Sequence, residues 1–507
     1  MSVAPKIGWE RRLGESAKEI GMKFEMACNW DLALLEGLAG SPVDELFGGM
    51  PNSPIAGGRG SFVAAEASPE FVENYVAEAR RRGFRFNFLL NATCLDNLEY
   101  QREGNRRIVE HIAWVESTGV DAVTVSIPFL LRIIKKQFPR LEVKISSHAR
   151  VNNPRTAQFW QEWGADSIIL KEDTARDFQM LKAIRKAFQG ELILIANPGC
   201  LFECHQALNH TNTMSHGSQS GHVSEGFMID SCYFSCTREK MADPRELIKI
   251  RWIRPEDVGH YEEIGIDRLK IIDRYKTTEM LLSYLKAYSE RRYEGNLIDL
   301  LNLPRRGAFL PVNLKYLMRE EHVNTDKLMD FADCCDMTVS ELIQIDSRQI
   351  PSDFLEFFKG MDCARASCDE CGYCDRIAGR AVKIKSEELK AQVAKYDAFL
   401  EDLVSGRVFE KEAEYREDED LVWEREAKRL HEDLLEAVPP LLKKIAQKKT
   451  FAGAEKSARE KSSRSIRKED ILKGWLTETP SVFLPRVKER LEELGVRIEP
   501  GLVPREK

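Results

Sequence analysis

Cysteine is the residue type whose number and spacing in this sequence point most directly to chemistry. The chain of 507 residues contains twelve cysteines, and most of them fall into two groups of four. The first cysteine group comprises Cys200, Cys204, Cys232 and Cys236, and the second comprises Cys363, Cys368, Cys371 and Cys374. Thiolates bind soft metals, so each group could hold one [4Fe-4S] cluster or one tetrahedral zinc ion.

Both groups also have simpler explanations. The first consists of two Cys-x3-Cys pairs joined by a long loop. These could also be four reduced, partly buried thiols that bind no metal. The second lies within twelve residues, and its alternative is a zinc ion that only organises a helical region. We expect metal at both groups, with a cluster favoured over zinc at the second. The histidines near the first group are alternative ligands: His205, His210, His216 and His222.

Polar side chains at the ends of predicted strands form a third set of candidates. His148 and Glu172 could perform general acid–base catalysis, and Arg274 or Arg150 could hold a carboxylate or phosphate in a bidentate pair. The alternative is that such residues only close hydrogen bonds within loops. The set also contains Asn29, Asn91, Ser146, Ser147, Asn197 and Asp273.

Short apolar runs alternate with amphipathic stretches over the first half of the chain and would position these residues. The candidate strands are residues 23–29, 43–49, 84–91, 120–128, 141–149, 165–172, 191–199 and 267–273. Eight such strands with intervening helices over about 250 residues predict a (β/α)8 barrel, whose chemistry lies at the carboxyl ends of the strands. A doubly wound open sheet is the alternative, but no G-x-G-x-x-G motif follows the first strand.

The domain organisation follows from these patterns. We expect an N-terminal extension (1–22), a barrel (23–290) with a cysteine-rich, irregular insertion (200–260), a helical region around the second cysteine group (291–380) and a charged helical region (381–507). A partial leucine stripe in residues 409–436 suggests docking to a protein partner.

Composition limits the class of protein. The net charge is −7, 43% of residues are hydrophobic and 31% are charged, as in a globular chain that does not favour nucleic acid as a partner. No run of about 18 apolar residues predicts a membrane span, and the polar start predicts a cytoplasmic location.

The insertion and the last predicted strand resemble a known family. NPGCLFEC after the seventh strand, SCYFSC, and the run WIRPEDVGHYEEIGIDRLKIIDR resemble the peptidase U32 family, which carries a collagenase-like peptidase label. The resemblance covers about residues 22–290 and is most specific over 197–275. Residues 427–475 faintly resemble the small helical domain of a light-independent protochlorophyllide reductase subunit.

The U32 resemblance implies a barrel with an iron–sulfur cluster near its mouth. Better understood members resemble oxygen-independent hydroxylases of ubiquinone precursors or RNA, with prephenate implicated as oxygen donor. By the same resemblance, Cys200, Cys204 and Cys236 look like cluster ligands, with Cys232 as the choice for the fourth. Many relatives carry KIEGR at the eighth strand, whereas Ile272 and Asp273 replace its Glu and Gly here.

Three functions are therefore weighed. The first is an iron–sulfur oxidoreductase that hydroxylates a small aromatic or isoprenoid-type metabolite without oxygen. The second is a peptidase, although the chain contains no HExxH or GxSxG motif. The third is a non-catalytic electron-transfer or assembly partner that docks through the C-terminal helices.

Overall fold

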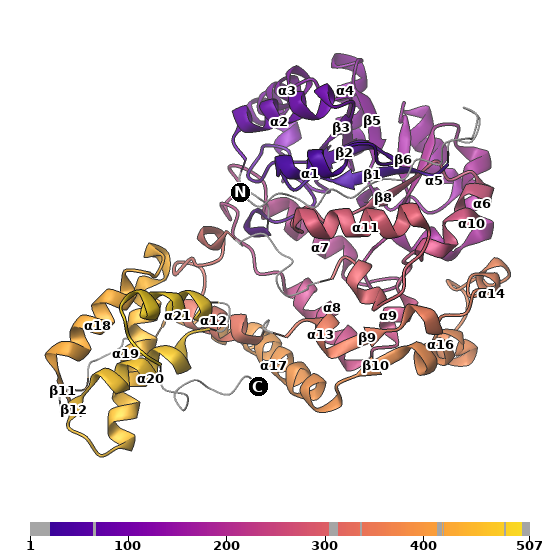
Figure 1. Ribbon diagram of the computed structural model, residues 1–507. Coiled ribbons are helices and arrows are strands. Elements are labelled where there is room, and N and C mark those ends of the chain that lie inside the picture. Colours follow the sequence, from indigo (N-terminus) through magenta and orange to yellow (C-terminus); the bar gives the residue numbers. More distant parts are fainter. Residues whose placement is uncertain are drawn as a thin grey trace. The chain divides into compact units, whose positions relative to one another are not determined.

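The first half of the chain forms a closed barrel of eight parallel strands, which confirms the predicted (β/α)8 class (Figure 1). The computed structural model describes residues 21–63, 67–303, 313–334, 337–412, 418, 420–480 and 483–498, so nearly all of the predicted N-terminal extension lies outside the described residues. The strands pair in chain order, and β1 closes on β8. They are β1 Lys23–Ala27, β2 Val43–Gly48, β3 Arg85–Leu90, β4 Ala122–Val125, β5 Glu142–Ile145, β6 Ser167–Ile169, β7 Glu191–Ile195 and β8 Arg268–Ile271.

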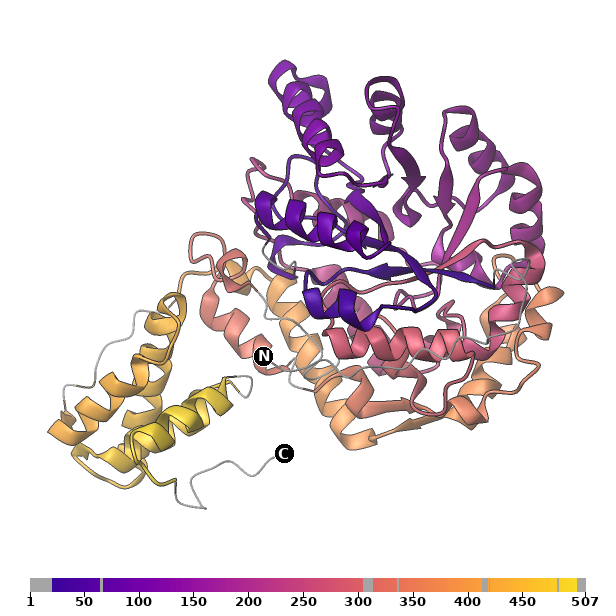
Figure 2. The ribbon, with the colours of Figure 1, turned by 45° about the horizontal axis from the view of Figure 1, so that its top comes forward.

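Helices follow the strands and surround the barrel (Figure 2). Sequence signals explain their ends: Ser68 caps α2 by accepting a hydrogen bond from the Phe71 amide at 3.1 Å, and Pro69 occupies the first turn. The barrel helices are α1 Leu32–Gly37, α2 Pro69–Arg81, α3 Arg102–Ser117, α4 Pro128–Gln137, α5 Pro154–Glu162, α6 Phe178–Ala187, α10 Val258–Ile264 and α11 Thr278–Glu290.

Charged side chains, and not only apolar ones, fill the barrel interior. Glu25 accepts hydrogen bonds from the Lys270 ammonium at 2.6 Å and from the Asn87 amide at 2.8 Å. Lys144 pairs with Glu45 in the same interior. The two lysines hold the pKa of Glu25 at about 2 against the desolvation that would raise it. A charge in this setting is tolerated only with its partners, so each interior carboxylate depends on the lysine that it contacts.

The cysteine-rich insertion is more ordered than the sequence suggested. Its expected irregular structure is wrong, because α7 Ala207–His216, α8 Ser231–Ala242 and α9 Glu246–Lys249 lie within it. The following region is not purely helical either, because β9 Ile343–Ile345 and β10 Val382–Ile384 form a small antiparallel sheet. Its helices are α13 Val339–Leu342, α14 Glu356–Lys359, α15 Cys368–Cys371 and α16 Tyr373–Ala381.

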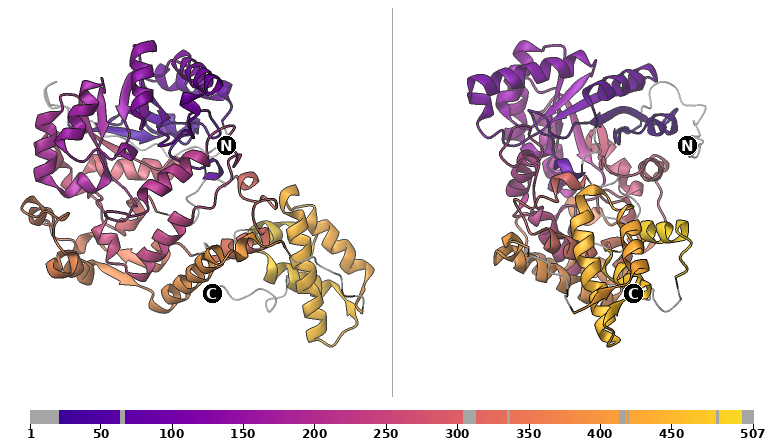
Figure 3. Two further views of the ribbon diagram at one scale, coloured as in Figure 1. Left: turned by 180° about the vertical axis from the view of Figure 1, so that it is seen from behind. Right: turned by 90° about the vertical axis from the view of Figure 1, so that its left-hand side faces the viewer.

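The chain divides into two compact units. The barrel unit contains Met1–Leu317 and Thr338–Val393, and the helical unit contains Met318–Met337 and Ala394–Lys507. In the helical unit α18, α19 and α20 pack together, and β11 Val422–Trp423 pairs with β12 Ser465–Ile466 (Figure 3). The remaining helices are α12 Thr325–Cys334, α17 Ser386–Val404, α18 Arg425–Leu435, α19 Lys443–Glu460, α20 Lys468–Glu478 and α21 Leu484–Glu493.

The leucine stripe that suggested docking is mostly core. Leu421, Leu430 and Leu434 are buried among the side chains of α19, α20 and α21 inside the helical unit. Their spacing therefore reflects packing within the chain. Within the described residues, no helix has the length and apolarity that crossing a membrane requires.

Candidate functional site

The first cysteine group converges at the mouth of the barrel. Cys200 and Cys204 lie in the segment that follows β7, and Cys232 and Cys236 lie on α8. Electrostatic interactions between the sulfurs link all four: Cys200 with Cys204 and Cys236, and Cys232 with Cys204 and Cys236. Two sequence-distant pairs thus meet at the face where barrels of this type house their chemistry.

Ion pairs hold the Cys200–Cys204 turn in place. The buried Lys171 ammonium lies 2.5 Å from the Glu203 carboxylate and 2.9 Å from that of Asp173. The Glu203 amide also donates to Asp173 at 3.1 Å. Because Lys171 and Asp173 lie at the carboxyl end of β6, these contacts tie the cysteine turn to the neighbouring strand.

The surroundings of the sulfurs suit ligands of a metal centre. Desolvation and the nearby Glu172 carboxylate raise the pKa of Cys200, although the residue is exposed at the mouth, so a cation nearby would favour its thiolate. The buried Lys240 ammonium donates to the Cys236 sulfur at 3.4 Å. Among the described residues, no group of Cys, His, Asp or Glu side chains has the close geometry of a single-ion site. A donor set of four thiols brought together in this way suits a soft-metal centre, either a four-iron cluster or a zinc ion.

His148 and Glu172 lie at the same mouth. His148 belongs to the short helix η3 Ser147–Ala149 after β5, and Glu172 begins η4 Glu172–Arg176 after β6. Desolvation lowers the pKa of His148 to about 4, and the charges of Arg59, His210 and Arg274 contribute. Desolvation raises the pKa of Glu172, although a hydrogen bond with Ser147 opposes this. At neutral pH the imidazole is therefore neutral, and its unprotonated nitrogen can accept a hydrogen bond.

Two guanidinium groups share the mouth. Arg274 follows β8, and a Cβ placed at Gly49 would lie 3.2 Å from one of its nitrogens. Desolvation and the like charge of Arg59 lower the pKa of Arg274 to about 10. Arg59 lies over the Tyr275 ring, 5.2 Å from its centroid. Within the described part of the chain, Arg274 has neither a hydrogen bond nor an ion pair, which leaves it available to an anionic ligand.

The second cysteine group also converges. Cys363, Cys368, Cys371 and Cys374 all line one hollow of the barrel unit, together with Phe202, Arg251 and Tyr373. The stretch from Cys368 to Cys374 folds as two short helices, α15 and α16, separated by Gly372 at φ +57°. Both predicted cysteine groups are thus brought together by the fold.

Comparison with known proteins shows which family the barrel resembles. Residues 42–294 match the model of peptidase family U32. A Methanocaldococcus jannaschii protein named uncharacterized protease MJ1657 is 25% identical over 320 residues, which cover 62% of this chain and 82% of the relative.

The barrel belongs to peptidase family U32. The Bacillus subtilis tRNA hydroxylation protein P1 is 20% identical over 229 residues, covering 43% of this chain and 53% of that protein. The solved structure of the U32 peptidase Mk0906 covers 52% of this chain and 96% of its own, at 20% identity and a TM-score of 0.39. In the helical unit, residues 402–500 match a family of proteins of unknown function, DUF2621.

The segment that follows β8 contains a residue with a strained backbone conformation. Asp273 occupies the glycine position of KIEGR-type relatives and has φ +122°, a backbone conformation that favours glycine. Its buried carboxylate lies 3.5 Å from the Lys276 ammonium, and its Oδ1 has no hydrogen-bond partner in the described part of the structure. The carboxylate and its lysine partner therefore occupy a strained position beside Arg274.

Several of the polar candidates in this U32 barrel form hydrogen bonds that stabilise the loops. The Asn197 amide donates to the carbonyls of Ile272 and Leu300, and Asn29 donates to the Lys276 carbonyl and the Thr278 hydroxyl. Asn91 instead braces the mouth: its Oδ1 accepts from the Gly58 amide at 2.9 Å. For Asn29 and Asn197 the simpler alternative, hydrogen bonding within loops, is therefore what the structure shows.

A peptidase nucleophile receives no support from Cys28. This thiol is fully buried after β1, and burial raises its pKa to about 12. Reactive cysteines have lowered pKa values, so the direction is opposite to that of an activated nucleophile.

Sequence reasoning missed Arg59 and Gly58. Both lie in the glycine-rich run 56–60 (AGGRG), which follows β2 and reaches the mouth. A Cβ at Gly58 would lie 2.5 Å from His148 Cε1, so the histidine packs directly on this glycine. The clustered glycines were the available signal, because close backbone approach is a common reason for them.

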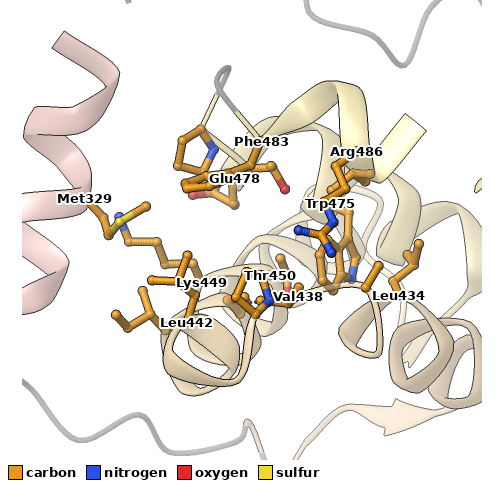
Figure 4. A pocket seen from close by; sticks show the side chains of 17 residues that line it. Met329, Leu434, Val438, Leu442, Lys449, Thr450, Trp475, Glu478, Phe483 and Arg486 are labelled. Atoms are coloured by element: carbon orange, nitrogen blue, oxygen red, sulfur yellow. The ribbon is translucent and has the colours of Figure 1, made fainter. Parts of the chain in front are cut away.

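The helical unit has an apolar hollow of its own. Met329 of α12, Leu442, Trp475 and Phe483 line it, with Lys449 at its edge (Figure 4). No cysteine or histidine lines this hollow, so it lacks the thiol and imidazole side chains that the barrel mouth contains.

Proposed function

We propose that the U32 barrel is an iron–sulfur redox enzyme that hydroxylates a small aromatic or isoprenoid-type metabolite without molecular oxygen. The observation that carries the proposal is the convergence of Cys200, Cys204, Cys232 and Cys236 at the mouth that also holds His148, Glu172 and Arg274. The B. subtilis relative named as a tRNA hydroxylation protein supports hydroxylation as the reaction class.

Each residue has a role in this proposal. The four thiolates would hold a [4Fe-4S] cluster, which supplies one-electron chemistry when bound. Neutral His148 accepts a hydrogen bond from the reacting group and orients it, and Glu172, whose pKa is raised, supplies or receives the proton beside it. Arg274 and Arg59 hold a carboxylate-bearing oxygen donor such as prephenate through charge-assisted hydrogen bonds.

The test measures iron, sulfide and zinc in anaerobically purified protein, together with its visible spectrum. Cys204→Ser should lose about four irons per chain, the content of one cubane, whereas Cys94→Ser should retain the wild-type content. Cys94 is a suitable control because it is a half-exposed cysteine outside both groups. Absence of iron at the first group after anaerobic reconstitution would contradict the proposal.

The reaction itself is tested with prephenate. We expect prephenate to perturb the spectrum of the reconstituted protein and Arg274→Met to weaken this binding at least tenfold, the loss expected for a charged hydrogen-bond partner. The hydroxylated product should form under argon. A product that requires oxygen would count against this function.

RNA is a second candidate substrate, favoured by the name of the B. subtilis relative. Transfer RNA should then bind the anaerobic protein with a steep salt dependence. Binding that is weak and independent of salt would leave the small metabolite as the proposed substrate.

A further inference from the structure

The two cysteine groups share a wall. Phe202 lies in the turn between Cys200 and Cys204, yet its ring lines the hollow of the second cysteine group. Cys200 and Phe202 are two residues apart, so their Cα atoms are at most about 7 Å apart. A centre held by the first group is therefore separated from the second hollow by little more than one side chain.

Arg251 completes this wall. Its guanidinium lies 3.7 Å from the centroid of the Phe202 ring and beside the Cys363 sulfur. The side chain is only 4% exposed, and its Nη1 has no hydrogen-bond partner among the described residues. A buried guanidinium nitrogen without a partner is costly unless a negative charge is placed beside it.

Further positive charge surrounds the same hollow. Lys249 lines it, and the guanidinium of Arg176, which is 2% exposed, interacts electrostatically with Cys374. The Nε of Arg176 likewise has no hydrogen-bond partner in the described part of the chain. Lys249 is paired with Glu246 and Asp375 also lines the hollow, so the buried positive charge beside the four thiols comes from Arg176 and Arg251. This charge favours an anionic thiolate centre.

The lining of this second site fits a [4Fe-4S] cluster. All four cysteines line the one hollow, and a four-iron cubane is held by four thiolates. Hydrogen bonds and positive charge near its sulfurs raise a cluster's reduction potential, which is the influence that Arg251 would exert.

We propose that the second cysteine group holds a second [4Fe-4S] cluster that delivers single electrons to the barrel-mouth cluster across the Phe202–Arg251 wall. In each transfer the second cluster is oxidised by one electron and the first is reduced by one, with no bond broken and no proton moved. A low-potential one-electron donor then reduces the second cluster again. The relay depends on the proposed function for the existence of its acceptor cluster.

The exposure of the second group suits this direction of transfer. Cys368 is exposed and Cys371 is half-buried, so an external donor can approach one edge of the site. Phe202 and Arg251 lie on the side shared with the barrel turn. An external donor can therefore reach the second cluster directly, and Phe202 lies between that cluster and the first cysteine group.

Metal analysis and electron paramagnetic resonance test the site itself. Wild-type protein should contain about eight irons per chain, and Cys368→Ser/Cys371→Ser should contain about four. After reduction with dithionite, the wild-type spectrum should show magnetic broadening from two neighbouring clusters, and the double variant should show a single narrow signal. Zinc at the second group, or iron unchanged by the double variant, would overturn the proposal.

The relay is tested by the rate of electron arrival at the first cluster. Phe202→Leu should slow reduction of the barrel cluster by a chemically reduced viologen at least tenfold. Phe357→Leu is the matched control, because Phe357 lines the same hollow but stacks on Tyr373 at 3.8 Å. Equal rates in the two variants would exclude transfer across Phe202.

Arg251→Gln provides a readout that is independent of rate. Removing the buried positive charge should lower the midpoint potential of the second cluster, whereas the potential of the barrel cluster should change less. An unchanged potential would contradict the role of Arg251. If the proposed function fails because the barrel holds no iron, wild-type protein will contain about four irons that the Cys368→Ser/Cys371→Ser variant loses, so the two failures are distinguishable.

Discussion

At the scale of single residues, the position of His148 depends on a missing side chain. A Cβ at Gly58 would lie 2.5 Å from His148 Cε1 and 2.9 Å from Asn91 Nδ2, so Gly58→Ala forces both side chains to move. We expect at least a tenfold loss of hydroxylation with iron content unchanged, since overpacking of this kind costs about 1–3 kcal/mol. Gly259→Ala, whose nearest neighbouring atom would be 3.8 Å away, is the control. A fully active Gly58→Ala protein would show that the position of His148 is not critical.

The protonation state of His148 gives a second prediction at this scale. Desolvation, with the charges of Arg59 and Arg274, holds its pKa at about 4, against 6.5 for an ordinary histidine. The imidazole should therefore stay neutral from pH 5 to pH 8. Nuclear magnetic resonance of histidine-labelled protein checks this, and the signal lost in His148→Gln identifies the residue. A titration midpoint between 6 and 7 would contradict the enclosed position of this histidine.

At the scale of elements, hydrophobic alternation predicted the strands but not the contacts that unite them. Each observed barrel strand lies within a predicted one, because buried parallel strands read as continuous apolar runs. The sheet of β9 and β10 was missed because its strands are only three residues each. Arg59 was missed because no local pattern shows that the segment after β2 reaches Arg274 after β8. The spacing of the cysteines was enough to assign them to two groups. That Phe202 lies between these groups could be recognised only from the structure.

The ion pairs of Lys171 give the prediction that belongs to this scale. Lys171→Met would leave Asp173 and Glu203 without their shared cation and loosen the Cys200–Cys204 turn from η4. The cost should be about 1–3 kcal/mol, because Lys171 is buried whereas Glu203 is half exposed. Iron loss to a chelator should therefore become about tenfold faster or more.

Lys135→Met is the matched control for this experiment. Lys135 pairs with Asp166 at the same distance, 2.5 Å, although its side chain is 25% exposed against 4% for Lys171, and it belongs to α4 and not to the cysteine turn. Chelation rates that rise equally in both variants would show that the turn does not depend on Lys171.

At the scale of the whole molecule, the chain consists of two units with separate cores. The chemistry-bearing residues of both cysteine groups belong to the barrel unit. The helical unit has its own apolar core around Leu430, Ile471 and Trp475. Because each unit buries its own apolar side chains, the stability of one can be changed by solution conditions that affect the other less.

Acid should destabilise the helical unit through His431. This side chain is 2% exposed, its Nδ1 accepts a hydrogen bond from Trp475 Nε1 at 3.1 Å, and burial lowers its pKa to about 4. The unfolded chain, with a histidine pKa near 6.5, binds a proton more readily than the folded unit. The contribution of neutral His431 to the free energy of unfolding is therefore fully present above pH 6.5 and is lost as the pH falls toward 4. The loss should reach at most about 3 kcal/mol. Hydrogen exchange of α18–α20 in the full chain, corrected for intrinsic rates, should increase at pH 5 in wild type. His431→Asn retains an acceptor without titrating, so an equal acid response in that variant would assign the effect to another group.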